Sequence, residues 1–353
     1  MKVKKYIEVI KTIILRKYLM TKCAGDIAKK TINKEALVLR NDILSDYKNL
    51  FISRGLSYDK LLSGSIKEQE TSLLWSIIVE RKPSVVLQVG TFVGYSSIIL
   101  AEALRYNGAG ILYSVDPEVM HRGIENPVDI AREIMKKRGL EKYVKFIRGW
   151  FSNCYGIGLM SGNEANNIQI VSQSLLKEIA PLDFVFIDGD HSTLSCINDF
   201  VAVKDFLGNN GIVAFHDSNT WYSVLLSIKI ILNDEIVKKY FKKDALWKEN
   251  GLFLLERTLS EDLVSLEILV RDRISKKPIP DAQLIYKKKK VKIGRDGKVS
   301  FDLIYSGKYQ IGIEAKGYQT LTDYTVLIDI NQLHQKKVIE MDPYLSLLPS
   351  QFD

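Results

Sequence analysis

The chain has 353 residues, and at about 150 residues per domain this length predicts two or three domains. Hydrophobic residues make up 46% and charged residues 26% of the sequence, a globular composition that excludes collagen-like and low-complexity proteins. The formal net charge is +8, but the lysines are spread along the chain and accompany no nucleic-acid-binding motif. We therefore expect a solvated basic surface and no nucleic-acid partner.

Cysteine content and the N-terminal stretch bear on location. Three widely spaced cysteines with no C-x-x-C pair predict neither a disulfide framework nor a zinc site, and they fit a cytoplasmic protein. The basic N-terminal stretch lacks a small-residue cleavage site, and no run of about 18 apolar residues occurs, so neither a signal peptide nor a transmembrane segment is expected. Residues 4–20 are predicted to form a packed helix, with a surface-lying amphipathic helix as the alternative.

The first 260 residues divide into two patterns. Residues 1–80 predict a helical cap, because apolar residues recur at three and four positions, as in segments 27–39 and 71–78. Over residues 81–260, short apolar runs alternate with helical stretches, which is typical of a doubly wound α/β domain. The predicted strands lie at 84–90, 111–116, 144–149, 182–190 and 211–217, followed by a helix at 221–232 and a late strand beside the sheet edge at 251–257.

The pattern changes again near residue 260. Residues 263–343 consist of strand-like segments and turn signals, which predict a small all-β sandwich. The lysine run at 287–290 is interpreted as a charged strand end that blocks edge pairing, with nucleic-acid or acidic-glycan binding as the alternative. The predicted strands lie at 265–272, 281–288, 298–304, 308–318 and 324–330.

The segment 85–96, VVLQVGTFVGYS, combines an apolar strand, a glycine turn and the start of a helix. Gly90 and Gly94 allow a close backbone approach, and a helix N-terminus offers unpaired N–H groups to a ligand. The spacing is G-x-x-x-G, whereas the dinucleotide fingerprint is G-x-G-x-x-G. A single adenosine-bearing cofactor is therefore favoured over a nicotinamide dinucleotide. A tight turn that merely needs glycine is the alternative.

Polar and aromatic residues follow the next two strands. Asp116 ends the second strand, where an acidic side chain can accept hydrogen bonds from ribose hydroxyls. Gly149 and Trp150 follow the third strand, and the indole is a candidate surface for adenine, or a core residue.

The fourth and fifth strands end in acidic residues and histidines. Asp188 and Asp217 come from adjacent strands and are candidate ligands for Mg²⁺, with Asn219 or Ser218 completing the set. His191 is the candidate general base near neutral pH. In the alternative reading, Asp190 and His191 cap the following helix while His216 packs in the core.

These segments resemble a known family. Residues 90–96 look like the cofactor loop of class I S-adenosylmethionine-dependent methyltransferases of the catechol and caffeoyl-CoA O-methyltransferase type. The strings FIDGDHS (186–192) and NNGIVAFHDSN (209–219) are similar to bacterial small-molecule and sugar O-methyltransferases. The resemblance covers about residues 70–257 and implies a Rossmann-like, mostly parallel seven-stranded sheet.

The same resemblance implies residue roles. A divalent metal would lie on Asp188 and Asp217, and the position of the family's catalytic lysine falls on His191. Two departures are Gln88, where the family usually carries an acidic residue, and Ser218, where it commonly has an asparagine metal ligand. The implied cofactor contacts are Gln88, Gly90, Thr91, Phe92, Gly94, Tyr95, Ser96, Asp116, Gly149, Trp150, Asp188 and His191.

The C-terminal segments 274–284, 294–303 and 306–320 are similar to carboxypeptidase regulatory-like domains of transthyretin-like fold. This resemblance implies an accessory module for substrate docking or assembly, or a stabilising one.

The predicted function is methyl transfer from S-adenosylmethionine to a hydroxyl of a sugar, a glycan or another polyhydroxylated small molecule. His191 and Asp188 are the predicted catalytic residues, with Mg²⁺ as the candidate metal on Asp188, Asp217 and Asn219. The alternatives are a catalytically silent ligand-binding scaffold and a non-methylating relative of the same fold. A homo-oligomer is compatible with the sequence.

Overall fold

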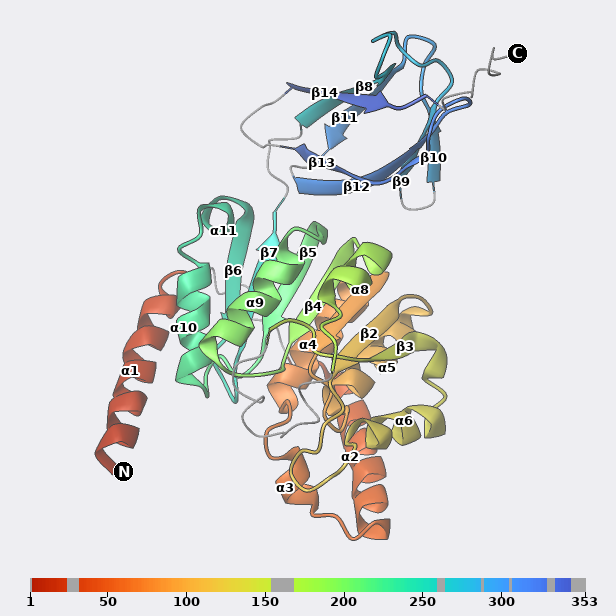
Figure 1. Ribbon diagram of the computed structural model, residues 1–353. Helices are drawn as coiled ribbons and strands as arrows, with labels where there is room; N and C mark the ends of the chain where they lie inside the picture. The colour runs from red at the N-terminus through yellow and green to blue at the C-terminus, as the bar shows by residue number, and fades with distance from the viewer. Residues whose placement is uncertain are drawn as a thin grey trace. The chain divides into compact units, whose positions relative to one another are not determined.

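The computed structural model describes residues 2–23, 32–153, 168–258, 264–286, 289–304, 307–328 and 334–343 (Figure 1). The chain divides into two compact units, Met1–Thr258 and Leu259–Asp353. No helix within the described residues is long and apolar enough to cross a membrane.

The first unit begins with four helices. The side chain of Asn33 accepts a hydrogen bond from the Ala36 N–H and so caps the second helix, which buries Tyr47 and Phe51 in the core. The first helix packs against α10 (Tyr222–Ile231) and buries Leu19, as expected for a packed helix. The helices are α1 (Lys2–Met20), α2 (Lys34–Ser53), α3 (Tyr58–Leu62) and α4 (Glu68–Arg81).

A seven-stranded sheet forms the centre of this unit, in the order β3-β2-β1-β4-β5-β7-β6. The strands pair in parallel except β7, which runs antiparallel to both β5 and β6. This confirms the predicted α/β fold. The strands are β1 (Val85–Val89), β2 (Ile111–Asp116), β3 (Val144–Arg148), β4 (Leu182–Ile187), β5 (Leu207–Phe215), β6 (Phe241–Leu246) and β7 (Leu252–Arg257).

The late strand predicted beside the sheet edge is present. The segment 251–257 forms β7, which lies between β5 and β6, so β6 is the edge strand. The sequence analysis missed β6 because Lys242, Lys243 and Asp244 interrupt its apolar pattern.

Helices connect the strands and cover the sheet (Figure 1). The centre of the sheet is apolar: Val86 and Leu87 of β1 and Val185 and Phe186 of β4 are fully buried, as expected for parallel strands covered on both faces. The remaining helices are α5 (Tyr95–Asn107), α6 (Val128–Lys137), the 3₁₀ helix η2 (Glu141–Tyr143), α8 (Ser172–Ile179), α9 (Thr193–Lys204), α10 and α11 (Glu235–Tyr240).

The topology brings the carboxyl ends of the first five strands to one edge of the sheet. Chain order reverses between β1 and β4, the point at which open α/β sheets bind ligands. The residues that follow these strands, at 90–94, 116, 149–150, 188–191 and 216–217, therefore gather there.

The second unit consists of two sheets, β10-β9-β12-β13 and β11-β8-β14, whose side chains share one apolar core. This confirms an all-β C-terminal part. The strand β10 (Lys289–Lys292) of the predicted lysine run is an edge strand, while residues 287–288 lie outside the described residues. Neither β10 nor the last strand, which pairs in parallel with β8, was among the strands predicted from the sequence. The other strands are β8 (Val264–Asp272), β9 (Gln283–Tyr286), β11 (Lys298–Ile304), β12 (Gly307–Glu314), β13 (Leu321–Ile328) and β14 (His334–Met341).

Candidate active site

Gln88 holds the glycine turn from inside the protein. Its side chain is fully buried, and its Nε2 donates to the Gly90 carbonyl at 2.7 Å and to Ser96 Oγ at 2.9 Å. Its Oε1 accepts a hydrogen bond from Ser97 Oγ at 2.9 Å. Both ends of the amide therefore tie β1 to the first turn of α5. The expectation that Gln88 contacts the cofactor stays a prediction.

The two glycines of the turn are required by contacts within the chain. Gly90 has a φ of +88°, and a Cβ there would lie 2.2 Å from the Asp188 carbonyl oxygen. Gly94 has a φ of +79°, and its Cβ would lie 2.3 Å from the Ala131 Cβ. The chain itself thus fills the space beside both glycines, which agrees with the tight-turn interpretation and brings the turn against Asp188.

Asp116 organises the other side of the turn. Its Oδ2 accepts hydrogen bonds from the Thr91 N–H at 2.8 Å and the Phe92 N–H at 2.9 Å, and its Oδ1 accepts one from the Glu118 N–H at 2.8 Å. Burial raises the pKa of Asp116, although the three N–H groups oppose the shift. The structure thus brings together Asp116, Thr91 and Phe92 of the predicted cofactor contacts.

The aromatic residues and the last glycine of the predicted site lie in different surroundings. Tyr95 is buried and packs edge-on against Tyr47 with ring centroids 5.7 Å apart, and burial raises its pKa to about 12. Trp150 is partly exposed at the end of β3. A Cβ at Gly149 would lie 2.4 Å from the Val171 Cγ1, so this glycine is also needed for packing.

Asp188, His191 and Asp217 form a compact group, with one potential ligand atom of each within 4.8 Å of the others. The His191 Nε2 lies 2.9 Å from the Asp217 Oδ2, and the imidazole stacks on Trp221 with the ring planes 6° apart. Burial disfavours the charged imidazole, but Asp217 and Asp188 outweigh it and raise the pKa of His191. Burial likewise opposes ionisation of Asp217, yet His191 and His216 lower its pKa.

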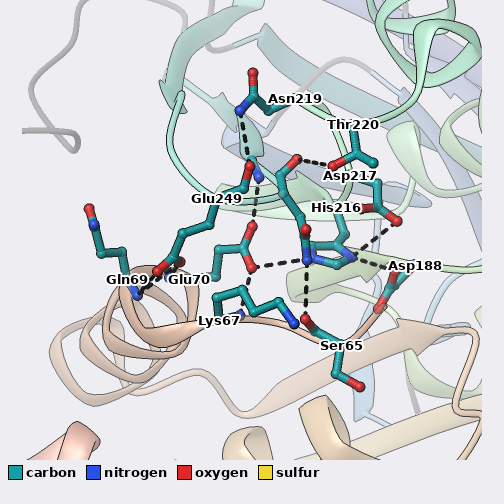
Figure 2. Close-up of polar contacts among 12 residues, drawn as sticks. Ser65, Lys67, Gln69, Glu70, Asp188, His216, Asp217, Asn219, Thr220 and Glu249 are labelled. Atoms are coloured by element: carbon teal, nitrogen blue, oxygen red, sulfur yellow. Dashed lines mark hydrogen bonds and ion pairs between the residues drawn. The ribbon is translucent and has the colours of Figure 1, made fainter. Parts of the chain in front are cut away.

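His216 lies at the centre of a buried charge network (Figure 2). Its side chain is fully buried, and its Nδ1 lies 2.7 Å from the Asp188 Oδ1 and 3.7 Å from the Asp217 Oδ2. Its Nε2 lies 3.5 Å from the Glu70 Oε2. Burial favours the neutral ring, but the three carboxylates hold the pKa of His216 well above its usual range. The three carboxylates therefore favour the charged form of His216, which is more than a simple core residue.

Glu70 connects the N-terminal helices to this network. It is fully buried, and its Oε2 accepts a hydrogen bond from the Lys67 N–H at 2.7 Å while its Oε1 accepts one from the Gly251 N–H at 2.6 Å. The Glu249 carboxylate accepts hydrogen bonds from the Gln69 and Glu70 N–H groups, at the N-terminus of α4 where an anion is favourable. Neither glutamate was among the site residues predicted from the sequence.

Two residues near the cluster have structural partners. Asn219 accepts a hydrogen bond from Arg16 Nη1 at 2.8 Å and donates one to the Glu249 carbonyl at 3.0 Å. Both ends of the Asn219 amide are thus bonded to other residues, and its role as a metal ligand stays a prediction. Asp190 accepts hydrogen bonds from the hydroxyls of Ser192 and Ser195. The residue that caps α9 is Ser192, and His191 pairs with Asp217, so the capping interpretation of Asp190 and His191 is wrong.

The comparisons with known proteins identify the α/β unit. Residues 87–218 match the family model described as a methyltransferase domain, from within β1 to the loop after β5. These residues form a methyltransferase domain. The match covers less than half of the chain and confirms the predicted enzyme class. A search of curated proteins found no match.

Solved structures of methyltransferases are similar to this chain at low sequence identity. One is the O-methyltransferase from Bacillus cereus in complex with SAH, with 16% identity, a TM-score of 0.44, and coverage of 62% of this chain and 91% of that one. Another is the O-methyltransferase TomG from Streptomyces achromogenes, involved in tomaymycin synthesis, in complex with SAM, with 16% identity, a TM-score of 0.43, and coverage of 64% and 97%. A third is the SAH-bound methyltransferase PaMTH1 from Podospora anserina, with 16% identity, a TM-score of 0.43, and coverage of 62% and 88%.

The donor set of the methyltransferase domain fits an adenosine cofactor better than it fits Mg²⁺. Asp116 Oδ1 accepts one hydrogen bond from the described residues, and a carboxylate oxygen has two acceptor positions, so one is available to a ribose hydroxyl. Mg²⁺ takes oxygen ligands, whereas Asp188, His191 and Asp217 offer two carboxylates and an imidazole. With Asn219 bonded elsewhere, two of the three predicted Mg²⁺ ligands, Asp188 and Asp217, remain in this group, and the set fits Mg²⁺ poorly.

Proposed function

We propose that the protein is an S-adenosylmethionine-dependent O-methyltransferase that methylates a hydroxyl of a sugar or another polyhydroxylated small molecule. The observation that carries the proposal is the histidine–carboxylate pair, His191 and Asp217, beside a glycine turn of the methyltransferase domain. The turn and the pair are adjacent because Gly90 packs directly on the backbone of Asp188.

The cofactor would supply an electrophilic methyl group, and the chain would hold it in place. Asp116 would accept the ribose hydroxyls, and Trp150 would offer its ring to adenine. Thr91 and Phe92 would keep the turn in position through their hydrogen bonds to Asp116. Because Gln88 is bonded inside the chain, its role would be to hold the turn.

His191 would act as the general base. When the Nε2 carries a proton toward Asp217, the Nδ1 is free to accept the proton of an acceptor hydroxyl, and the resulting imidazolium is stabilised by Asp217 and Asp188. Trp221 would fix the plane of the ring by stacking. Positioning the hydroxyl oxygen against the methyl group supplies the rest of the acceleration, at most about 7 to 11 kcal/mol.

Methyl transfer can be tested directly. The full chain would be incubated with methyl-labelled S-adenosylmethionine and a panel of sugars, and label in the sugar would be read by mass spectrometry. We expect label on at least one hydroxyl in the wild type and none with His191→Ala. Parallel reactions with Mg²⁺ and with a chelator would test metal dependence, and equal rates are expected because the donor set does not fit Mg²⁺. Binding of S-adenosylhomocysteine without turnover on any hydroxylated acceptor would instead support the silent scaffold.

A further inference from the structure

A pocket opens between the N-terminal helices and the methyltransferase domain. Its volume is about 180 Å³, and it lies among α2, α3, the segment 63–67 and the start of α5. Aliphatic side chains form part of the lining, and hydroxyl groups and charged groups form the rest. The residues used below are Arg40, Tyr58, Ser65, Lys67 and Tyr95.

Arg40 is the main charged group of this pocket. Its side chain is 16% exposed, and its partner among the described residues is Glu68, at 3.7 Å, whose carboxylate is 60% exposed. The Arg40 Nε is buried and makes no hydrogen bond within the described part of the chain. A guanidinium with a buried free donor and a distant, solvated partner retains capacity for an anionic ligand.

The positive charge of Arg40 acts on the hydroxyl groups of two tyrosines. Burial raises the pKa of Tyr58 and that of Tyr95, and the positive charge of Arg40 opposes both shifts. Lys67 adds a second cation to the lining, against one carboxylate from Asp59. The pocket therefore combines a positive charge with phenol and serine hydroxyls, a chemistry suited to an acidic, hydroxylated ligand.

The pocket wall is joined to the proposed catalytic cluster. The Lys67 N–H donates to Glu70, which faces His216, and the Asn250 Nδ2 donates to the Ser65 carbonyl at 3.1 Å. Figure 2 shows Ser65 and Lys67 in the same close-up as His216 and Asp188. On the other side, Tyr95 directly follows the glycine turn.

We infer that this pocket binds an anionic group of the methyl acceptor, a carboxylate or a phosphate on a hydroxylated molecule, with Arg40 as the residue that selects it. The inference rests on the proposed function. A neutral sugar would leave the guanidinium with an unpaired buried donor, whereas an acidic sugar would pair with it.

Glucose 6-phosphate and glucose are two probes of similar shape that differ in charge, and together they test the inference. Each is titrated at constant ionic strength into the full chain saturated with S-adenosylhomocysteine. Calorimetry is expected to show binding of glucose 6-phosphate and at least about tenfold weaker binding of glucose. Arg40→Gln should weaken the phosphate probe about tenfold or more, and Lys67→Gln should weaken it less. Arg81→Gln, whose arginine pairs with Glu256 outside the pocket, is the matched control and should bind as the wild type does.

The outcomes separate the two proposals. Equal binding in Arg40→Gln and the wild type, or no binding of the phosphate probe, overturns the inference. A weaker affinity of Arg40→Gln for S-adenosylhomocysteine also overturns it, because the pocket would then hold the cofactor. If S-adenosylhomocysteine does not bind the wild type but Arg40-dependent phosphate binding persists, the proposed function fails and the anion site stands.

Discussion

The two units of the chain differ in where they place charge. In the α/β unit, Glu70, His216 and Asp217 are buried together at the carboxyl edge of the sheet. In the second unit, the buried polar residues among those described are Asp272 and Gln335. Its ion pairs within the described residues are exposed, as in Lys290–Glu314, or partly exposed, as in Arg271–Glu340.

The buried charges gathered at the carboxyl edge of the α/β sheet indicate that this edge serves function rather than folding stability. Desolvating a charged group costs several kcal/mol unless partners compensate for it. Among the described residues of the second unit, Asp272 is the single buried carboxylate beside an apolar core, so a cluster of buried charges is not a general need of this chain. The following changes test the contrast, from the largest expected effect to the smallest.

His191→Ala should have the largest effect, since it removes the proposed base. We expect turnover to fall by about 10² to 10⁴ fold, with S-adenosylhomocysteine affinity within about twofold of the wild type. Steady-state kinetics and calorimetry would measure the two quantities. Lys290→Ala in the second unit is the control and should keep full turnover. Undiminished turnover in His191→Ala would remove this histidine from the mechanism.

His216→Gln should reduce stability most strongly. The substitution leaves Glu70, Asp188 and Asp217 without their shared cation, and loss of one partner of a buried ion pair costs about 3 to 5 kcal/mol. Urea unfolding would measure the change. Glu70→Gln keeps a hydrogen-bonding side chain on α4 and should cost less. A loss below about 1 kcal/mol for His216→Gln would mean that the imidazolium is not held by these carboxylates.

A buried carboxylate outside the histidine network, Asp199, predicts that the folding stability depends on pH. Burial raises the pKa of Asp199 to about 7, against a hydrogen bond donated by Ser152. The folded chain therefore keeps a proton that the unfolded chain releases above about pH 4, so stability falls as pH rises toward about 7 and levels off beyond it.

Asp199→Asn should remove this pH dependence. The variant cannot ionise and retains an acceptor for Ser152, so above about pH 7 it should exceed the wild type by up to about 4 kcal/mol. The difference should vanish near about pH 4. Thermal unfolding across this range would measure it, and parallel pH profiles for the two proteins would contradict the prediction.

The smallest effect is expected on the surface of the second unit. The side chains of Lys290 and Glu314 are 55% and 40% exposed, and a pair of this kind contributes about 0 to 1 kcal/mol. Lys290→Ala should therefore shift the unfolding midpoint in urea only slightly. A loss comparable to that of His216→Gln would abolish the contrast between the two units.

Much of the fold could be predicted from the sequence because most of its strands have a recognisable local pattern. The apolar runs that became β1 to β5 each end in glycine or a charged residue, and their alternation with helices implies parallel pairing. The strands β6 and β14 lack this signal. Both contain adjacent lysines, which interrupt an apolar pattern. β6 joins its sheet by antiparallel pairing with β7, and β14 joins its sheet by parallel pairing with β8, which lies far away in the sequence.

The candidate site, like the fold, could be predicted only where local sequence patterns mark it. Asp188, His191 and Asp217 follow strand ends, so parallel topology brings them together. Asn219 is only two residues from Asp217, but Asp217 has a φ of +57° and the chain turns away there. Glu70 enters from a helix more than one hundred residues earlier in the chain, which no local pattern reveals. The hint was an acidic residue opening an otherwise apolar helix.

The most direct measurement is calorimetric titration of S-adenosylhomocysteine into the full chain and into Asp116→Asn. We predict one site of micromolar affinity, weakened about tenfold or more in the variant, because the amide cannot serve both the turn and the ribose as the carboxylate does. Absence of binding to the wild type, or equal binding by both proteins, would contradict the assignment of the cofactor to this edge of the sheet.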